Sequence, residues 1–127
     1  MGRPKPTRPT DGELAILNVL WKREAALTIR QIVADLKKPR PYTYATVQTL
    51  VRIMEKKGLV KRGPERYPAL YSPASPEEIS KKQMLHEFID RVFGGSMKQM
   101  VMHALASKKS STTDIDEIEK LIDRMEE

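Results

Sequence analysis

Residues 43–72 have the sequence TYATVQTLVRIMEKKGLVKRGPERYPALYS, and this stretch decides the fold. Its first half predicts a helix that follows Thr43, whose hydroxyl suits a helix cap, and that runs from Tyr44 until Gly58. Glycine is the expected left-handed terminator of a helix. The apolar side chains recur at helical spacing and should point into a core: they are Val47, Leu50, Val51 and Met54.

A hairpin is predicted directly after this helix. Residues 59–62 and 69–72 have the composition of short strands. Residues 63–68 between them contain the glycine and the two prolines of a turn. The second half of the quoted stretch therefore predicts two strands and a connecting loop.

Two helices are predicted upstream. Thr10 and Glu13 have capping-box spacing before an apolar stripe, which predicts a helix over residues 11–22. Thr28 begins a second capping box before a helix over residues 29–37, and the prolines that follow this range disallow further helix. Three helices followed by a hairpin are the order of a winged helix-turn-helix, so a mainly α fold with a small β-hairpin wing is expected.

The rest of the chain, residues 74–127, predicts three amphipathic helices. Ser75 suits the start of the first, Gly94 and Gly95 suit its end, and Thr113 is expected to cap the last one. Their apolar faces have no core of their own to cover, so we expect them to meet the same region of a second copy. The expected dimerisation residues are Leu85, Phe88, Ile89, Val92, Met100, Val101, Ile118, Leu121 and Ile122.

Charge divides the chain in nearly the same place. Residues 1–72 carry 15 Lys and Arg against 6 Asp and Glu, a net of +9, whereas residues 73–127 carry 8 against 11, a net of −3. A concentrated basic patch is what phosphate neutralisation requires, although a basic protein without a polyanion partner fits the charge alone equally well. We therefore expect a basic N-terminal arm with a winged-helix DNA-binding domain over residues 1–73, and a helical dimerisation region over residues 74–127.

Length and composition exclude several classes of protein. A chain of 127 residues suits one compact domain with a helical appendage rather than two enzyme domains. Cysteine is absent, which excludes disulfides, thiolate metal sites and cysteine nucleophiles. No window approaches the length of an apolar membrane span, and the first residues lack the apolar core of a signal peptide, so a cytoplasmic protein is expected.

Catalysis and metal binding have little support in the sequence. The two histidines, His86 and His103, lie in no nucleophile or metal motif. His86 and Asp90 have helical spacing that could hold a metal ion, but a surface pair without a third ligand is the more frequent case. The methionines near Met100 are more often adaptable packing than a soft-metal site. We expect no enzyme, no metal site and no cofactor.

Four segments of the chain carry a resemblance to a known family: residues 13–21, ending in Leu20-Trp21, then Thr46-Val47-Gln48-Thr49-Leu50, Lys56-Lys57-Gly58-Leu59-Val60 and Phe93-Gly94-Gly95-Ser96-Met97-Lys98. In this order they resemble the penicillinase-repressor family of winged-helix repressors (BlaI/MecI/CopY type). The resemblance implies a homodimer that represses transcription from a palindromic double-stranded DNA operator, at genes for β-lactamase, penicillin-binding proteins or metal handling. It also implies release by a membrane sensor protease system that leads to cleavage in the dimerisation region.

The chain departs from the family pattern in three ways. Ile53 stands where the family commonly has arginine, and Arg52 lies one residue earlier, so the family's base preference does not transfer directly. The bond cut in the family, commonly Asn-Phe, aligns with His103-Ala104, which is the candidate cleavage position here despite the different residues. The cysteine cluster of copper-responsive members is missing, which excludes their sensing chemistry.

The first two turns of the helix after Thr43 are the expected reader of DNA bases, because the N-terminal part of a recognition helix enters the major groove. Its polar face could instead be an ordinary solvated face, but the order of the elements and the charge asymmetry favour DNA. The alternative function is a protein-interaction adaptor whose winged helix docks on a protein partner. The expected DNA-binding residues are Thr28, Arg30, Tyr44, Ala45, Thr46, Gln48, Thr49, Arg52, Arg62 and Arg66.

Overall fold

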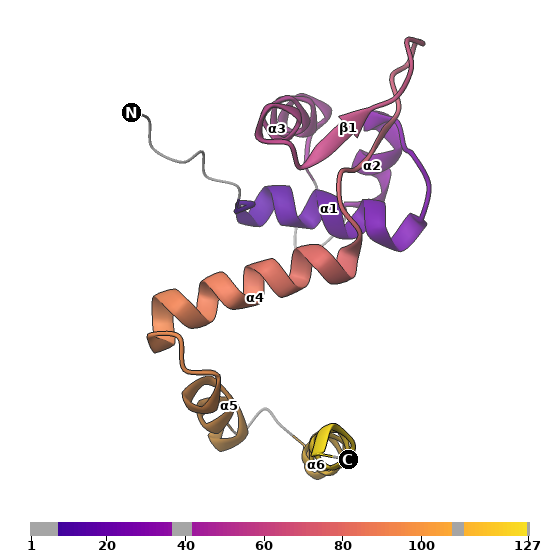
Figure 1. Ribbon diagram of the computed structural model, residues 1–127. Helices are drawn as coiled ribbons and strands as arrows, with labels where there is room; N and C mark the ends of the chain where they lie inside the picture. Colours follow the sequence, from indigo (N-terminus) through magenta and orange to yellow (C-terminus); the bar gives the residue numbers. More distant parts are fainter. Residues whose placement is uncertain (1–7, 37–41, 108–110, 127) are drawn as a thin grey trace. The chain divides into compact units, whose positions relative to one another are not determined.

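The computed structural model describes residues 8–36, 42–107 and 111–126 (Figure 1). Within these ranges the chain forms a mainly helical winged helix followed by further helices, as predicted. Its contacts group into two units, Met1–Lys81 and Lys82–Glu127, which are described separately below. The domain boundary expected after residue 73 stays a prediction. Residues 1–7 of the expected basic N-terminal arm lie outside the described residues.

Three helices form most of the first unit: α1 (Asp11–Arg23), α2 (Ile29–Asp35) and α3 (Tyr44–Lys57). α1 begins with the predicted capping box, since the Thr10 hydroxyl accepts from the Glu13 N–H at 3.3 Å and the Glu13 carboxylate accepts from the Thr10 N–H at 2.9 Å. These reciprocal bonds satisfy two donors that a helix start otherwise leaves free. The local sequence therefore sets where α1 starts.

The ends of these helices differ slightly from the prediction. α1 extends one residue further than expected because Glu24 adopts a left-handed conformation and ends it there. α2 ends before residue 36 rather than at residue 37, because Leu36 leaves helical geometry and buries its side chain in the core. α3 begins after Thr43 and ends at Gly58, whose φ of 79° is the left-handed conformation expected for a terminating glycine.

The wing is an antiparallel pair of strands, β1 (Val60–Arg62) and β2 (Tyr71–Pro73), and the connecting hairpin extends away from the helices (Figure 1). Both strands begin later than the ranges 59–62 and 69–72 predicted. A bridge outside the hairpin explains the register: Leu27 and Tyr71 exchange two backbone hydrogen bonds of 2.9 and 2.8 Å. The segment before α2 thus fixes which residues of β2 face β1.

The core of the first unit lies where α1, α2, α3 and the wing meet. Three of the four residues predicted to point inward from α3 are buried, and Leu50 is half-buried. Among the described residues, one charged side chain is buried in this core: Glu13 is 1% exposed, and its carboxylate accepts from the Lys57 ammonium at 2.8 Å. The buried apolar residues are Ile16, Leu17, Leu20, Trp21, Leu27, Ile32, Leu36, Val47, Val51, Met54, Val60 and Tyr71.

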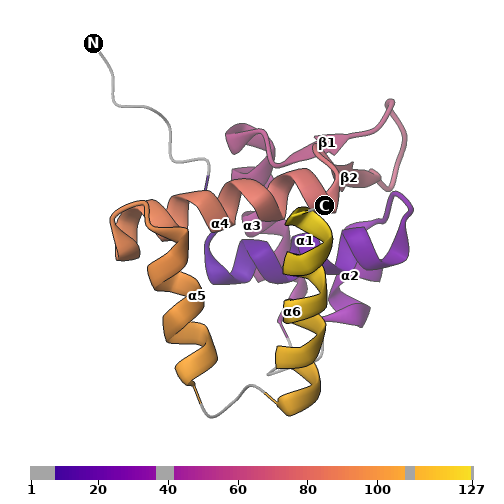
Figure 2. The same cartoon turned by 60° about the horizontal axis from the view of Figure 1, so that its bottom comes forward.

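The second unit consists of successive helices (Figure 2): most of α4 (Glu77–Phe93), then α5 (Met97–Ala106) and α6 (Thr112–Glu126). The predicted Gly-Gly stop is confirmed, because Gly94 and Gly95 both have positive φ and the Gly95 N–H donates to the Ile89 carbonyl at 3.0 Å. Such a bond satisfies a carbonyl that the helix end leaves free.

The start of α6 differs from the prediction. Thr113 was expected to cap this helix, but it lies inside the first turn. The Ser111 hydroxyl accepts from the Asp114 N–H at 3.1 Å instead, and Asp114 in return accepts from the Ser111 N–H at 3.5 Å. A serine with an acidic residue three positions later forms a reciprocal cap, which the threonine at position 113 does not form.

Candidate nucleic-acid interface

The outward face of α3 is positioned by the residues on its inner face. Val47, Val51 and Met54 are at most 1% exposed, so their packing fixes the rotation of the helix about its axis. Gln48 and Arg52 are then exposed on the other side. Together with Tyr44, Ala45 and Thr49, which are also exposed, they form a continuous surface over the first two turns and slightly beyond.

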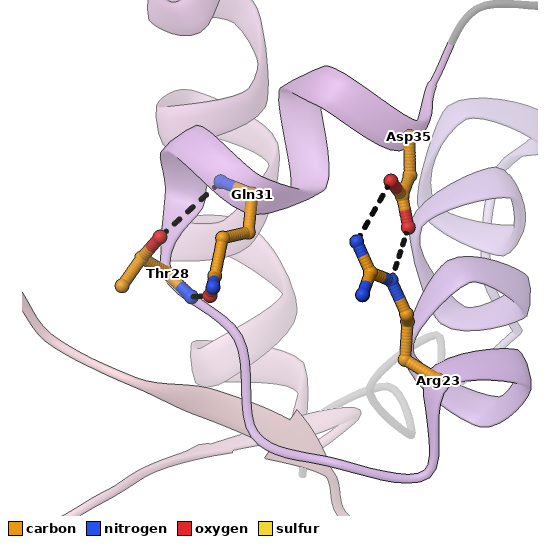
Figure 3. A network of polar contacts seen from close by, with 4 residues as sticks. All are labelled: Arg23, Thr28, Gln31 and Asp35. Atoms are coloured by element: carbon orange, nitrogen blue, oxygen red, sulfur yellow. Dashed lines mark hydrogen bonds and ion pairs between the residues drawn. The ribbon is translucent and has the colours of Figure 1, made fainter.

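The helix that precedes α3 is held by two sets of polar contacts (Figure 3). Thr28 and Gln31 form a second capping box, with bonds of 3.2 and 2.9 Å. Arg23 donates to both carboxylate oxygens of Asp35, at 2.7 and 3.1 Å, which ties the end of α1 to the end of α2. The hydrogen bond to Asp35, and then its charge, raise the pKa of Arg23 above its ordinary value.

A polar hollow of about 260 Å³ brings α3 and the wing together. Gln48 and Arg52 of α3 line it with Arg62 of β1, and this meeting of two arginines from separate elements follows from the fold, not from their sequence spacing. Ile29 and Tyr71 form its apolar part. Two guanidinium groups and an amide around one hollow are suited to a phosphate or to the edge of a base.

An acidic residue also lines this hollow, which the sequence reasoning missed. Glu55 lies one turn after Arg52 on α3 and lines the same hollow. A carboxylate at this place repels phosphate. The sequence could have indicated Glu55, because it lies three positions after Arg52 and residues three apart are neighbours on a helix surface.

The other residues predicted to bind DNA are accessible. Arg30 and Arg66 are exposed, and Thr28 is half-buried. Thr46 is also exposed, and a hydrogen bond of 2.9 Å joins its hydroxyl to that of Thr43. Sequence reasoning passed over Tyr67, whose side chain is 97% exposed in the wing loop beside Arg66. An arginine and an aromatic ring adjacent in an extended loop are typical of nucleic-acid contacts, but the two residues have no motif spacing that would have singled them out.

Six of the nine residues predicted to form a dimer are exposed. Ile89 is 3% exposed within the single chain, so it is not available to a second copy. Met100 and Val101 are half-buried. The six others are between 36% and 52% exposed, large values for apolar side chains: they are Leu85, Phe88, Val92, Ile118, Leu121 and Ile122.

The candidate cleavage position lies inside a helix. His103 and Ala104 are both exposed residues of α5. The His103 ring lies 5.3 Å from the Phe93 ring, and Phe93 in turn lies 5.8 Å from Phe88, with the two phenyl rings edge to face. The bond between His103 and Ala104 is therefore part of a regular helix whose neighbouring side chains are engaged with the end of α4.

Neither a metal centre nor a membrane span is found in the described part of the chain. No three metal-ligating side chains gather among residues 8–36, 42–107 and 111–126. No described helix has the length and apolar content that crossing a bilayer requires.

Residues 9–124 match the family model described as Penicillinase repressor. The penicillinase repressor of Bacillus licheniformis is 25% identical over 114 residues, 90% of this chain and 88% of that protein. The penicillinase repressor of Staphylococcus aureus is 23% identical over 110 residues, which cover 87% of this chain and 86% of that protein. The transcriptional regulator BlaI of Mycobacterium tuberculosis is 29% identical over 100 residues, covering 78% and 72%. A ferric uptake regulator structure from Francisella tularensis is 15% identical and covers 76% of this chain and 88% of that chain. Its TM-score of 0.48 is too low to support a conclusion.

Proposed function

The chain belongs to the penicillinase repressor family, and from this premise we propose that it acts as a homodimer on a palindromic DNA operator. Membership itself makes the chain a DNA-binding transcriptional repressor and confirms the prediction that it is not an enzyme. The proposal adds the dimer, the symmetry of the operator and the residues that contact it. The regulated genes belong to the β-lactamase and antibiotic-response class or to related genes.

The observation that carries the proposal is the polar hollow between α3 and the wing. Gln48 and Arg52 lie on the helix that would enter the major groove, while Arg62 approaches from the wing. Glutamine forms paired hydrogen bonds with adenine, and arginine forms them with guanine or phosphate. One half-site of the operator would therefore be contacted by α3 and β1 together.

The remaining contacts are proposed to go to the backbone. Thr28 and Arg30 begin α2, where a hydroxyl and a guanidinium suit phosphate contacts that set the register without reading bases. Arg66 extends this contact along the wing. The net charge of +9 over residues 1–72 gives the long-range attraction that such binding requires (15 cations less 6 anions).

The second half of the proposal assigns α4, α5 and α6 to the dimer. A palindrome presents two half-sites, so two winged helices must be joined at a fixed spacing. The exposed apolar residues of α4 and α6 are the surface proposed for this. A membrane sensor protease system that leads to cleavage at His103-Ala104 is the switch that the family suggests for this chain.

The test is binding to DNA taken from upstream of this protein's own gene, after footprinting has located the protected site. Gln48→Ala and Arg52→Ala should each weaken binding to that site by about 1–3 kcal/mol, because each removes a base or phosphate contact and leaves the core unchanged. Gln99→Ala and Arg124→Ala delete the same groups from exposed positions of α5 and α6 and should have no effect.

A salt titration separates the repressor from the protein-interaction adaptor. Binding through several phosphates weakens steeply as salt concentration rises, because counterions are released from DNA. An adaptor would bind duplex DNA weakly at every salt concentration. Unchanged affinity in both Gln48→Ala and Arg52→Ala would show that α3 does not read the operator.

A further inference from the structure

A second hollow in the first unit shares no residue with the one proposed to bind DNA. Its volume is about 440 Å³, within the range of small-molecule sites in proteins. The end of α1, the connection to α2, the end of β2 and the start of α4 all contribute to it. Its apolar lining consists of Leu20, Trp21, Ala25, Ala26, Pro73 and Pro76.

The floor of this hollow is fixed before any ligand arrives. Leu20 and Trp21 are 1% and 8% exposed, so both belong to the core and present only part of their surface to the hollow. The indole N–H of Trp21 donates to the Ser75 carbonyl at 3.1 Å, which orients the ring and leaves no unsatisfied polar atom there. A preformed apolar floor costs a ligand little ordering.

The charged residues that line the hollow are both acidic, although the unit is strongly basic. They are Glu24 and Glu77. Glu77 is paired with Lys81 one turn further along α4, so part of its charge is neutralised. Glu24 forms no ion pair among the residues that the structure describes. The carbonyl end of α1 adds partial negative charge beside Glu24, while the amide end of α4 opposes it beside Glu77.

The backbone at Glu24 is an independent indication. Its φ of 54° and ψ of 33° are left-handed, and Glu24 is the only described residue other than glycine with a positive φ. Glycine or asparagine would occupy this position with less strain. A long acidic side chain that lines a hollow, on a residue whose backbone is in an unfavourable conformation, suggests that its carboxylate is used.

We propose that this hollow binds a small amphipathic cation, whose apolar body lies against Trp21 and the two prolines and whose ammonium group meets the Glu24 carboxylate. An aromatic ring joined to an amine by a short alkyl chain has the required size and polarity. Tryptophan also attracts cations through its ring face, which adds to the preference for a positive ligand. This proposal does not depend on DNA binding.

The chain contains one tryptophan, so its intrinsic fluorescence reports on this site. The full chain is titrated with phenylpropylammonium, phenylpropanol and phenylpropanoate, which have similar bodies and differ in charge. We expect phenylpropylammonium to change Trp21 emission at a concentration at least tenfold lower than phenylpropanol requires, and phenylpropanoate to be weakest. N-acetyltryptophanamide under the same conditions corrects for quenching by collision. Equal affinity for the three, or no saturable change with any, would overturn the proposal.

Substitutions in and outside the hollow test whether the ligand binds there. Glu24→Gln keeps the shape of the side chain and should remove the preference for the amine, while Ala26→Leu should fill the hollow and abolish binding of both amine and alcohol. Glu65→Gln, in the wing loop, removes the same charge elsewhere and should bind like the parent. Persistence of the amine preference in Glu24→Gln would refute the assignment of this carboxylate.

Glu24→Gly distinguishes a ligand role from a structural one. Glycine accepts the left-handed backbone, so this variant should melt at a higher temperature than the parent and still lose the amine preference. A variant that is more stable and binds the amine unchanged would show that Glu24 has no part in the site. Circular dichroism confirms that each variant is folded.

Discussion

The two units of this chain use apolar residues in opposite ways. In the first, the apolar faces of α1, α2 and α3 close on one another and on the wing, and apart from Ile89 every buried apolar residue of the described chain belongs to this unit. In the second, α6 has no buried residue at all, although its apolar side chains recur at helical spacing. The first unit closes its core within its own chain, whereas the second leaves apolar side chains exposed, which is the surface proposed above for a second copy.

The largest expected effect follows from deleting one side chain in each unit. Met54→Ala should lower the free energy of unfolding by about 2–5 kcal/mol, because Met54 is fully buried and its removal leaves a cavity. Leu121→Ala should leave the unfolding of a dilute, monomeric chain unchanged, because Leu121 is 50% exposed there. Urea unfolding of both variants at low concentration measures the difference. An equal loss in both would mean that α6 packs within its own chain.

The second prediction breaks the proposed dimer. Phe88→Asp combined with Leu121→Asp places two charges on the exposed apolar surface and should raise the dimer dissociation constant at least a hundredfold, about 2.8 kcal/mol at 1.4 kcal/mol per factor of ten. Gln83→Asp with Gln99→Asp adds the same charges at exposed polar positions and serves as the control. Sedimentation velocity checks both proteins. An intact dimer in the first would remove this surface from the interface.

The third prediction separates folding from repression. A chain ending at His103 lacks α6 and the end of α5, so it should be mainly monomeric and bind a full palindrome about a hundredfold more weakly, because the two winged helices lose their effective concentration. Its first unit should remain folded, since none of that core is removed. Gel shift and circular dichroism on the same preparation test both statements. Undiminished affinity would show that residues 104–127 do not couple dimerisation to DNA binding.

The smallest effect concerns a charge inside the first core. Lys57→Met keeps most of the side-chain stem but leaves the buried Glu13 carboxylate without its ammonium partner. Stability should fall by about 1–2 kcal/mol, less than for a fully buried pair because Lys57 is 19% exposed. Lys120→Met on the exposed surface of α6 should change stability very little. Thermal unfolding compares the two, and equal midpoints would contradict a role for the pair.

Local signals in the sequence were sufficient for most helix boundaries of the first unit. Helix ends are set here by capping boxes at Thr10 and Thr28 and by the terminating glycine Gly58. Each of these signals acts over three or four residues, so it can be recognised in the sequence alone. The exact register of the strands was not predictable in this way. It depends on the bridge between Leu27 and Tyr71, which are distant in the sequence.

The sequence was sufficient to predict which residues belong to the candidate site, but not how they are arranged in space. Helical spacing identified the outward face of α3, because burial of the inner face determines it. The spacing could not bring Arg62 into the same hollow as Arg52, or show that Ile89 is buried. Each of these depends on packing between elements, and a pattern along one helix contains no information about its neighbours.

The bridge between Leu27 and Tyr71 has a consequence for the entropy of binding. Two hydrogen bonds fix the base of the wing to the segment before α2, and the Gly63 N–H donates to the Leu70 carbonyl at 2.8 Å on the way to the loop. Ordering a free backbone costs about 1–2 kcal/mol per residue, and here that cost is met during folding. A wing that meets the operator as proposed therefore arrives with its base already ordered. The loop around Arg66 and Tyr67 lies beyond the last of these hydrogen bonds.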